Sequence, residues 1–365
     1  MSHGFQLVWE RFVPEVSSHA QFYRHLKTGA EVLALTNDDP NKTFGIAFPI
    51  SPRDDTGVAH ILEHCVLLGG SRKYPVRGLL IEVLKGSLAT FADGIMFFDR
   101  TIYAFATQNL RDFHNLMDVY LDAVFHPLLD RDVFEREGWR YELESLDAPL
   151  TPRGVVFNEV KAGWGTADLL LLVEPLRALF PDTVYGRYIG GHPRHILKLS
   201  YEELLKFHSD HYHPSNAYIF LYGDLPVEEC LRRLDETLKN FDHPRSKPPI
   251  PFQKRFTAPR VIALPYQPSN DADKAYVVVS WTLAENDDPV RTISLEALRE
   301  ALLGSSDNPL SRMLISSGLG EDLVGSHDWL QPGLSSMSLI RYLVLTVGLK
   351  GVEIERVDRV EPLLS

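Results

Sequence analysis

The hydrophobic pattern of the first 240 residues alternates between the period of strands and the period of helices. Residues 31–48 read as a hairpin, because two apolar runs flank a cluster of Asp, Pro and Asn at 38–41. The clearest helix follows residue 110, where apolar residues recur at i, i+3, i+4, i+7, i+8 and i+11. These residues are Phe113, Leu116, Met117, Tyr120, Leu121 and Val124. Pro127 should end the helix.

Other elements are predicted on both sides of this helix. A helix begins near residue 57, where any of residues 54–56 could cap it, and a strand covers 101–109. The remaining pattern predicts helices at 131–145, 153–180, 200–210 and 226–240, and an apolar strand at 216–225. This mixture predicts an α+β fold, with an antiparallel-rich sheet packed against helices.

A proline-rich stretch at 242–254, DHPRSKPPIPFQK, has the composition of an interdomain linker. We therefore place two domains at 1–245 and 246–365. Beyond the linker, the strand, turn and strand pattern returns at 260–281, and a helical pattern without histidine follows at 292–304. The fold is thus expected to be a duplicated domain, in which the second copy is incomplete and has no metal site.

The sequence GVAHILEHCVLLGG at 57–70 places two histidines and a glutamate in an apolar run. On a helix, His60 and His64 project from the same face and can hold one ion between them. Zinc accepts two imidazoles and a carboxylate and leaves a fourth position for water. Glu63 lies beside the pair, where it could take a proton from that water. This H-x-x-E-H order occurs in zinc peptidases.

A helix whose histidines only hydrogen-bond to their neighbours is the alternative to this metal site. A third ligand would distinguish the two. Glu159, in GVVFNEVKAGWG, lies among apolar residues, so we expect it to be partly buried and to need a cation. A salt bridge to Arg or Lys is the alternative role for Glu159.

The overall composition narrows the function further. A net charge of -12 argues against nucleic-acid binding, which needs clustered Lys and Arg, and would suit a surface that attracts basic peptides. No apolar stretch reaches the ~18 residues that span a bilayer, and the start lacks the features of a signal or transit peptide. Cys65 and Cys230 are too few for a disulfide framework and fit a reducing compartment. We expect a cytoplasmic protein, with the mitochondrial matrix or another organelle as the alternative.

Several stretches, in order along the chain, resemble the pitrilysin/insulinase (inverzincin) metallopeptidases, most closely their presequence-peptidase branch. They are TGVAHILEHCVLLGGSRKYPVRG, SLATF, DRTIYAFATQN, VYLDAVFHPLL, EGWRYE, GVVFNEVKAG, HYHPSNA and SSGLGED. The resemblance implies a zinc-dependent endopeptidase that degrades short unfolded peptides, such as cleaved targeting peptides, in a chamber formed by four homologous α+β domains. By position it makes His60, His64 and Glu159 the ligands of one Zn²⁺ per chain, and Glu63 the catalytic base.

The resemblance also implies a peptide substrate that binds as an extra strand on a sheet edge. In the family that edge carries Asn, Ala and Thr, where this sequence has Asp93, Gly94 and Met96. An aspartate keeps the acceptor of asparagine but loses its amide donor. We therefore expect weaker docking of the substrate near the metal, on a strand edge that is itself retained.

The full chain of the family is more than twice as long as this one. Its C-terminal half supplies an Arg and a Tyr that stabilise the oxyanion, and neither can be assigned here. This leaves an alternative function: a non-catalytic or half-enzyme zinc-containing subunit that binds peptides and works as a homodimer or with a partner C-terminal half.

Two further groups of residues invite a functional interpretation. His208, His211 and His213, in KFHSDHYHPSN, look like a second metal cluster, but the resemblance makes this segment a structural junction between a helix and a strand. Either Glu137 or Glu142, the first and last residues of the EGWRYE motif, could orient the zinc ligands without binding the metal itself.

Overall fold

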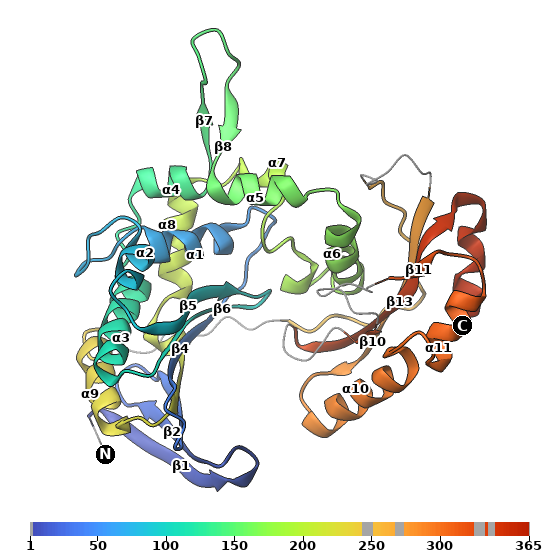
Figure 1. The fold of residues 1–365 in the computed structure, drawn as a ribbon. Coiled ribbons are helices and arrows are strands. Elements are labelled where there is room, and N and C mark those ends of the chain that lie inside the picture. The colour runs from blue at the N-terminus through green and yellow to red at the C-terminus, as the bar shows by residue number, and fades with distance from the viewer. Residues whose placement is uncertain (1–2, 243–250, 267–273, 325–332, 335–339, 365) are drawn as a thin grey trace. The chain divides into compact units, whose positions relative to one another are not determined.

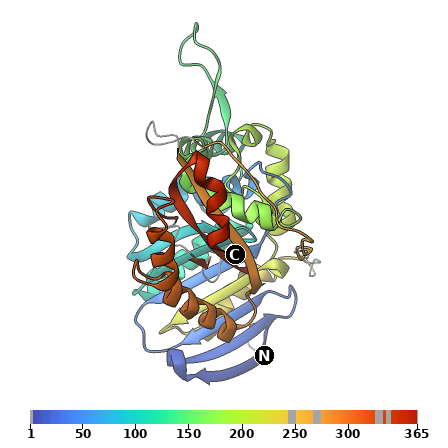
Figure 2. The ribbon, with the colours of Figure 1, turned by 90° about the vertical axis from the view of Figure 1, so that its right-hand side faces the viewer.

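The computed structural model describes residues 3–242, 251–266, 274–324, 333–334 and 340–364. The chain divides into two compact units. Figure 1 and Figure 2 show it coloured from blue at the N-terminus to red at the C-terminus. The first unit comprises Met1–Ala162 and Tyr188–Ile250, and the second comprises Gly163–Arg187 and Pro251–Ser365. The segment 163–187 therefore belongs to the second unit, although it lies inside the range expected for the first domain.

A seven-stranded sheet forms the framework of the first unit (Figure 1). Its order is β1 (Phe5–Val13), β2 (Ser18–His25), β3 (Glu31–Thr36), β9 (Tyr218–Gly223), β4 (Lys42–Pro49), β6 (Arg100–Thr107) and β5 (Ala89–Met96). Neighbouring strands are antiparallel, except β3 and β9, which are parallel. The predicted antiparallel-rich sheet is confirmed.

The predicted hairpin at 31–48 is wrong in its pairing, although both of its strands form. Strand β9 lies between β3 and β4 and pairs with each of them. The turn between β3 and β4 reaches around the end of β9, where the Asp39 carboxylate accepts a hydrogen bond from Tyr222 Oη at 3.0 Å. A local apolar pattern gives no sign that a strand from much later in the chain enters this gap.

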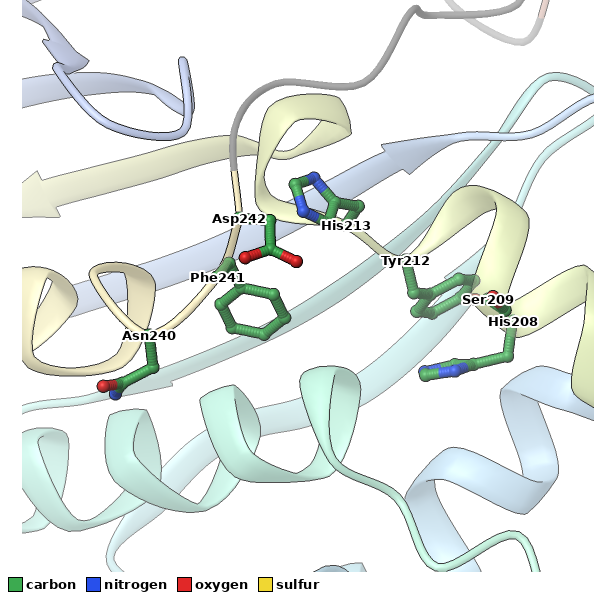
Figure 3. A pocket seen from close by; sticks show the side chains of 7 residues that line it. All are labelled: His208, Ser209, Tyr212, His213, Asn240, Phe241 and Asp242. Atoms are coloured by element: carbon green, nitrogen blue, oxygen red, sulfur yellow. The ribbon is translucent and has the colours of Figure 1, made fainter.

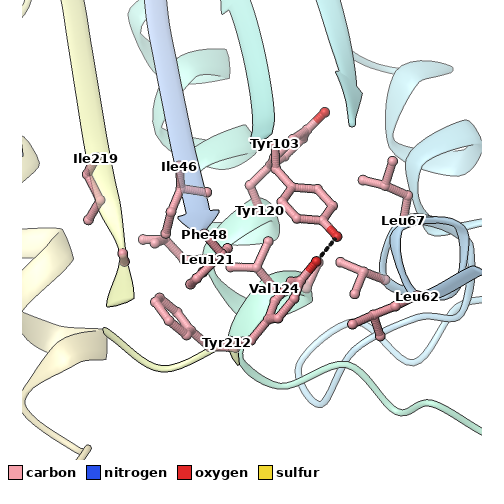
Figure 4. Packing of buried hydrophobic residues seen from close by; sticks show 14 of the residues in the cluster. Ile46, Phe48, Leu62, Leu67, Tyr103, Tyr120, Leu121, Val124, Tyr212 and Ile219 are labelled. Carbon is pink, nitrogen blue, oxygen red and sulfur yellow. Dashed lines mark hydrogen bonds between the residues drawn. The ribbon is translucent and has the colours of Figure 1, made fainter. Parts of the chain in front are cut away.

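Four helices pack around the sheet: α1 (Val58–Leu68), α3 (Leu110–Phe125), α8 (Tyr201–His211) and α9 (Val227–Leu238). The six apolar residues that predict α3 from the sequence are each at most 1 % exposed. Figure 4 shows three of them, Tyr120, Leu121 and Val124, in one cluster with Phe48 of β4 and Leu62 of α1. The core of this unit therefore lies between the sheet and these helices, of which α1 carries His60, Glu63 and His64.

Two of the predicted helical ranges contain more than one element. The range 131–145 holds α4 (Arg131–Glu137) and then β7 (Arg140–Glu142), which pairs with β8 (Thr151–Arg153) in a separate hairpin. The range 153–180 holds α5 (Val155–Gly163) and α6 (Ala167–Leu179), which are separated at Gly165 with a φ of 82°. Helices α2 (Leu79–Leu84) and α7 (Pro193–Ile196) are short. Glycines that break the helical backbone explain why one pattern becomes several elements.

The second unit has its own sheet and core. Strand β13 (Tyr342–Glu353) pairs with β10 (Lys274–Glu285), β11 (Asp322–Leu323) and β12 (Gly333–Leu334). Helices α10 (Pro289–Leu303) and α11 (Pro309–Ser316) contribute Leu303 and Leu314 to its core, and α10 confirms the helix predicted at 292–304. Residues 260–266 form no strand, so the first strand of the predicted repeat is wrong, while its turn at 267–273 lies outside the described residues.

In the described part of the chain, none of the helices combines the length and the apolar character that crossing a membrane requires.

Candidate metal centre

Helix α1 places both histidines on one side while its other side is buried. Ile61, Leu62 and Val66 are 0 % exposed, whereas the His60 and His64 side chains are 20 % and 17 % exposed. The two imidazole rings lie 5.0 Å apart, centre to centre, in an edge-to-face arrangement. The i, i+4 spacing therefore brings the rings together at the rim of the core, where an ion could reach them.

The start of α1 differs from the prediction. Its N-cap is Gly57, with a φ of 68°, and no side chain caps the helix. Asp54 instead accepts hydrogen bonds from the backbone N and from Oγ1 of Thr56, at 2.9 and 2.6 Å, in the turn before the helix. Glycine occupies the N-cap position because the backbone of Gly190 and Gly191 lies directly against it.

Helix α5 brings Glu159 to the two histidines. Its Oε2 atom lies 3.8 Å from Nε2 of His60 and 3.8 Å from Nε2 of His64. The Glu159 side chain is 54 % exposed, so the expectation that this carboxylate is partly buried among apolar residues is wrong. Val156 and Phe157 are the residues of α5 that are buried.

These three side chains fit a zinc ion. Tetrahedral zinc with Zn–N and Zn–O distances of about 2.0–2.2 Å holds its ligand atoms roughly 3.3 Å apart. The observed 3.8 Å separations therefore require a movement of only about half an ångström. Two imidazoles and one carboxylate are also donors that zinc accepts at sites with an open fourth position. Glu63 adjoins them: ligand atoms of His60, Glu63 and His64 lie within 4.8 Å of one another.

The Nδ1 atom of each histidine is held on the side away from Glu159. Nδ1 of His60 lies 3.3 Å from the main-chain oxygen of Gly190, and Nδ1 of His64 lies 3.3 Å from Oε2 of Glu137. Both acceptors favour the tautomer with the proton on Nδ1, which leaves each Nε2 lone pair available to a metal. The sequence offered Glu137 or Glu142 for this role, and the structure places Glu142 in the β7–β8 hairpin, bound to Arg140 at 2.6 Å.

Burial and neighbouring charges separate the pKa values of the two histidines. Burial, together with the charge of His64, lowers the pKa of His60 to about 4. Burial also acts to lower the pKa of His64, but its hydrogen bond with Glu137 and the charges of Glu63 and Glu159 outweigh this and raise it. His60 is therefore a neutral imidazole near pH 7, the form that binds a metal.

Glu63 and Glu159 occupy different environments, although both face the histidines. Glu63 is 8 % exposed, and burial raises its pKa to about 7, with Asp93 and Glu159 adding to the effect and His64 opposing it. Glu159 is half exposed. Two carboxylates in such unequal surroundings suit two roles, one as a ligand and one as a proton acceptor.

Strand β5 runs beside α1 and ends the sheet. It carries Asp93, Gly94 and Met96, and pairs with β6 along one edge, so that it is the last strand in the sheet order. Gly94 directly adjoins the base: a Cβ atom there would overlap Oε1 of Glu63 and would lie 2.9 Å from Cδ1 of Leu67. The Asp93 carboxylate accepts a hydrogen bond from the backbone N of Gly94 at 2.9 Å, so it binds its own strand.

The three histidines near the end of α8 make hydrogen bonds within the first unit. Nε2 of His208 lies 2.9 Å from the Val124 main-chain oxygen, Nδ1 of His211 lies 2.9 Å from that of Phe207, and Nδ1 of His213 lies 2.8 Å from Ser215 Oγ. His208 and His213 line a surface pocket with Tyr212, Phe241 and Asp242 (Figure 3). None of these three histidines belongs to the group of described residues, His60, Glu63 and His64, whose ligand atoms all lie within 4.8 Å of one another.

Comparison with models of protein families defines the class of protein to which the chain belongs. The family model "Insulinase (Peptidase family M16)" matches residues 50–164, and the model "Peptidase M16 inactive domain" matches residues 198–347. The chain therefore belongs to the pitrilysin/insulinase-type peptidase family M16.

Within this family, the chain is similar to presequence proteases. It is 42 % identical to presequence protease 1, chloroplastic/mitochondrial, of Arabidopsis thaliana, over 99 % of this chain and 33 % of the relative. It is 36 % identical to the mitochondrial presequence protease of Mus musculus, over 100 % of this chain and 35 % of the relative. The chain thus spans about a third of the length of the curated relatives it matches.

Solved structures share the fold. Pitrilysin superposes with a TM-score of 0.63 at 19 % identity, over 96 % of this chain and 36 % of the pitrilysin chain. A protease from Helicobacter pylori superposes with a TM-score of 0.64 at 14 % identity, over 93 % of this chain and 76 % of that chain. The α+β fold of the pitrilysin type predicted from the sequence is confirmed.

Proposed function

We propose that the chain forms the zinc-binding part of an endopeptidase that hydrolyses short unfolded peptides. The observation that carries this proposal is the convergence of both Nε2 atoms on one Glu159 oxygen, with Glu63 beside them. Similarity to presequence proteases supports peptides, including cleaved targeting peptides, as the substrate class. The proposed peptide hydrolysis depends on these four side chains, His60, Glu63, His64 and Glu159.

His60, His64 and Glu159 would hold one Zn²⁺. When bound, the metal would lower the pKa of a water molecule and polarise the scissile carbonyl of the peptide. The Gly190 carbonyl and the Glu137 carboxylate keep the two imidazole rings oriented by accepting hydrogen bonds from their Nδ1 atoms. The ligand atoms are thereby fixed before the substrate arrives.

Glu63 would act as the general base and then as the general acid. Its carboxylate takes the proton of the attacking water and later donates that proton to the leaving amine. A nearby cation favours the ionised form of a carboxyl, so metal binding would lower the pKa of Glu63 from the raised value that burial gives it. Glu63 would then begin the reaction as a proton acceptor.

Strand β5 would bind the peptide through its backbone. As the last strand of the sheet order it can pair with an extended peptide, and such pairing reads the main chain and tolerates many side chains. Asp93, Gly94 and Met96 would lie along this contact, with Gly94 next to Glu63. The scissile bond would therefore be brought close to the base.

The test combines zinc content with peptide cleavage by the purified chain. We expect about one zinc per chain and cleavage that a chelator stops. Glu63→Gln should keep the zinc and lower kcat by about 10²–10⁴-fold, whereas Glu228→Gln, on the exposed side of α9, should match the wild type. Cleavage that persists in Glu63→Gln would refute the role of Glu63. Zinc binding without any cleavage would instead support a peptide-binding subunit that needs a partner half or a second copy.

A further inference from the structure

The loop at 188–192 lies directly against the start of α1. A Cβ atom at Gly57 would lie 2.8 Å from the main-chain oxygen of Gly190 and 3.0 Å from Cα of Gly191. Gly57 and Gly191 have φ values of 68° and 99°, which side chains with a Cβ rarely adopt. The two backbones therefore touch, and only glycine permits this approach.

Asp55 binds this loop at both of its ends. Its Oδ1 atom accepts a hydrogen bond from the backbone N of Tyr188 at 2.9 Å, and its main-chain oxygen accepts one from the backbone N of His192 at 2.8 Å. Its Oδ2 atom lies 3.7 Å from Nδ1 of His195, and the Asp55 side chain is 11 % exposed. A largely buried carboxylate with several donors around it is held in one position.

Gly190 lies between the two bound ends of the loop. Its carbonyl oxygen is the atom 3.3 Å from Nδ1 of His60. The position of that oxygen therefore depends on the bonds that Asp55 makes on either side of it. A backbone carbonyl that accepts from the second nitrogen of a histidine fixes the tautomer and the orientation of the ring.

We propose that Asp55 is a positioning residue for His60, acting through the Gly190 carbonyl. The hydrogen bonds of Asp55 fix the 188–192 loop, and the loop in turn fixes the position of the Gly190 carbonyl. That carbonyl accepts from Nδ1 of His60 and so orients the imidazole with its Nε2 atom towards Glu159. This inference rests on the proposed function, because it assumes that His60 binds the metal. Residues that orient metal ligands from behind typically contribute about 10–100-fold in metal affinity.

The neighbouring Asp54 supplies a matched control. Its carboxylate makes its hydrogen bonds to Thr56, in the turn before α1. Asp54→Ala and Asp55→Ala therefore remove the same group from adjacent positions, but only Asp55→Ala removes a bond to the 188–192 loop. A general effect of shortening an aspartate in this turn would appear in both variants.

The experiment measures the zinc affinity of the full chain by competition with a chelator, and the visible spectrum of the Co²⁺-substituted protein. We expect Asp55→Ala to bind zinc about 10–100-fold more weakly and to show an altered Co²⁺ spectrum. Asp54→Ala should match the wild type. Asp55→Asn should retain most of the affinity, because an amide oxygen can still accept the hydrogen bond from Tyr188. Equal affinity of Asp55→Ala and the wild type, or equal losses in Asp55→Ala and Asp54→Ala, would overturn the inference.

If Asp55→Ala does not fold, a comparison of Asp55→Glu with Asp55→Asn tests the positioning role of Asp55 instead. Asp55→Glu keeps the charge but moves the carboxylate by one methylene, whereas Asp55→Asn keeps the position and loses the charge. We expect Asp55→Glu to bind zinc more weakly than Asp55→Asn, and equal affinities would overturn the inference. A wild-type chain that binds no zinc would refute the proposed function itself, which is a separate outcome.

Discussion

The buried Glu137 lies against the partly exposed His64, with Oε2 of Glu137 3.3 Å from Nδ1 of His64. Glu137 is 3 % exposed and its other oxygen accepts from Nε of Arg136 at 2.8 Å. Burial acts to raise the pKa of Glu137, but its hydrogen bonds with His64 and Arg136 outweigh this and lower it. Glu137 is therefore a carboxylate that orients one of the two imidazoles, as the Gly190 carbonyl orients the other.

Removing this carboxylate should weaken zinc binding. We expect Glu137→Gln to lower the zinc affinity about 10–100-fold, because a side-chain amide accepts more weakly from His64 and leaves Arg136 without its charged partner. Glu142→Gln, in the exposed hairpin, is the control and should match the wild type in a chelator competition assay. Unchanged affinity in Glu137→Gln would show that the pair does not orient His64.

The contact between Gly94 and Glu63 predicts a steric effect on catalysis. Because even one methyl at Gly94 would overlap the Glu63 carboxylate, Gly94→Val should displace the base and lower kcat at least tenfold, with zinc still bound. Gly86→Val is the matched control, since a Cβ there meets no atom within 4 Å. Steady-state cleavage and zinc content would be measured for both variants. Full activity of Gly94→Val would mean that Glu63 does not need this space.

Metal removal should lower the stability of the first unit as well as stop cleavage. A ligand that binds only the folded state at 100 times its Kd stabilises that state by about 2.7 kcal/mol. Zinc should therefore raise the Tm of the apo protein, and His60→Ala should abolish most of this rise. Thermal unfolding with and without zinc provides the measurement. An equal rise of Tm in His60→Ala would place the zinc elsewhere.

The partly buried His208 of α8 predicts a loss of stability in acid. Burial lowers the pKa of His208, although its hydrogen bond to the Val124 carbonyl opposes the shift. Below a pH of about 6.5, the unfolded chain takes up protons that the folded chain does not, so the free energy of unfolding falls as the pH falls.

His208→Gln should reduce this dependence on pH. One such group changes the slope by at most about 1.4 kcal/mol per pH unit, and urea unfolding at several pH values between 5 and 8 would measure it. If the variant keeps the wild-type slope, His208 is not protonated on unfolding in this range.

The parts of the fold that follow from local periodicity could be predicted from the sequence. Helix α3 is the best case, because one stripe of six apolar residues has to face a core, and all six do. The pairing of β3 with β9 could not be predicted, because it joins segments far apart in the chain. The same limit applies to the ends of helices: Gly57 begins α1 because of the loop at 188–192, which no nearby residue indicates.

The candidate site likewise combines features that local sequence predicts with features that depend on segments distant in the chain. The spacing of His60 and His64 is local, so a helix alone brings their rings together. Glu159 stands out in the sequence as an acidic residue among apolar neighbours, and the family resemblance assigns it as a ligand. The expected burial of its side chain is wrong, because it is 54 % exposed. The contributions of Gly190 and Asp55 have no signal in the sequence, since they act through backbone atoms brought close by folding.

The central claim is that His60, His64 and Glu159 hold one zinc ion. Anomalous diffraction at the zinc absorption edge, from crystals of the full chain grown with zinc, tests it most directly. The account predicts one peak about 2.0–2.2 Å from Nε2 of both histidines and from a Glu159 carboxylate oxygen. A peak that lies away from these atoms, or crystals with no peak in the first unit, would contradict it.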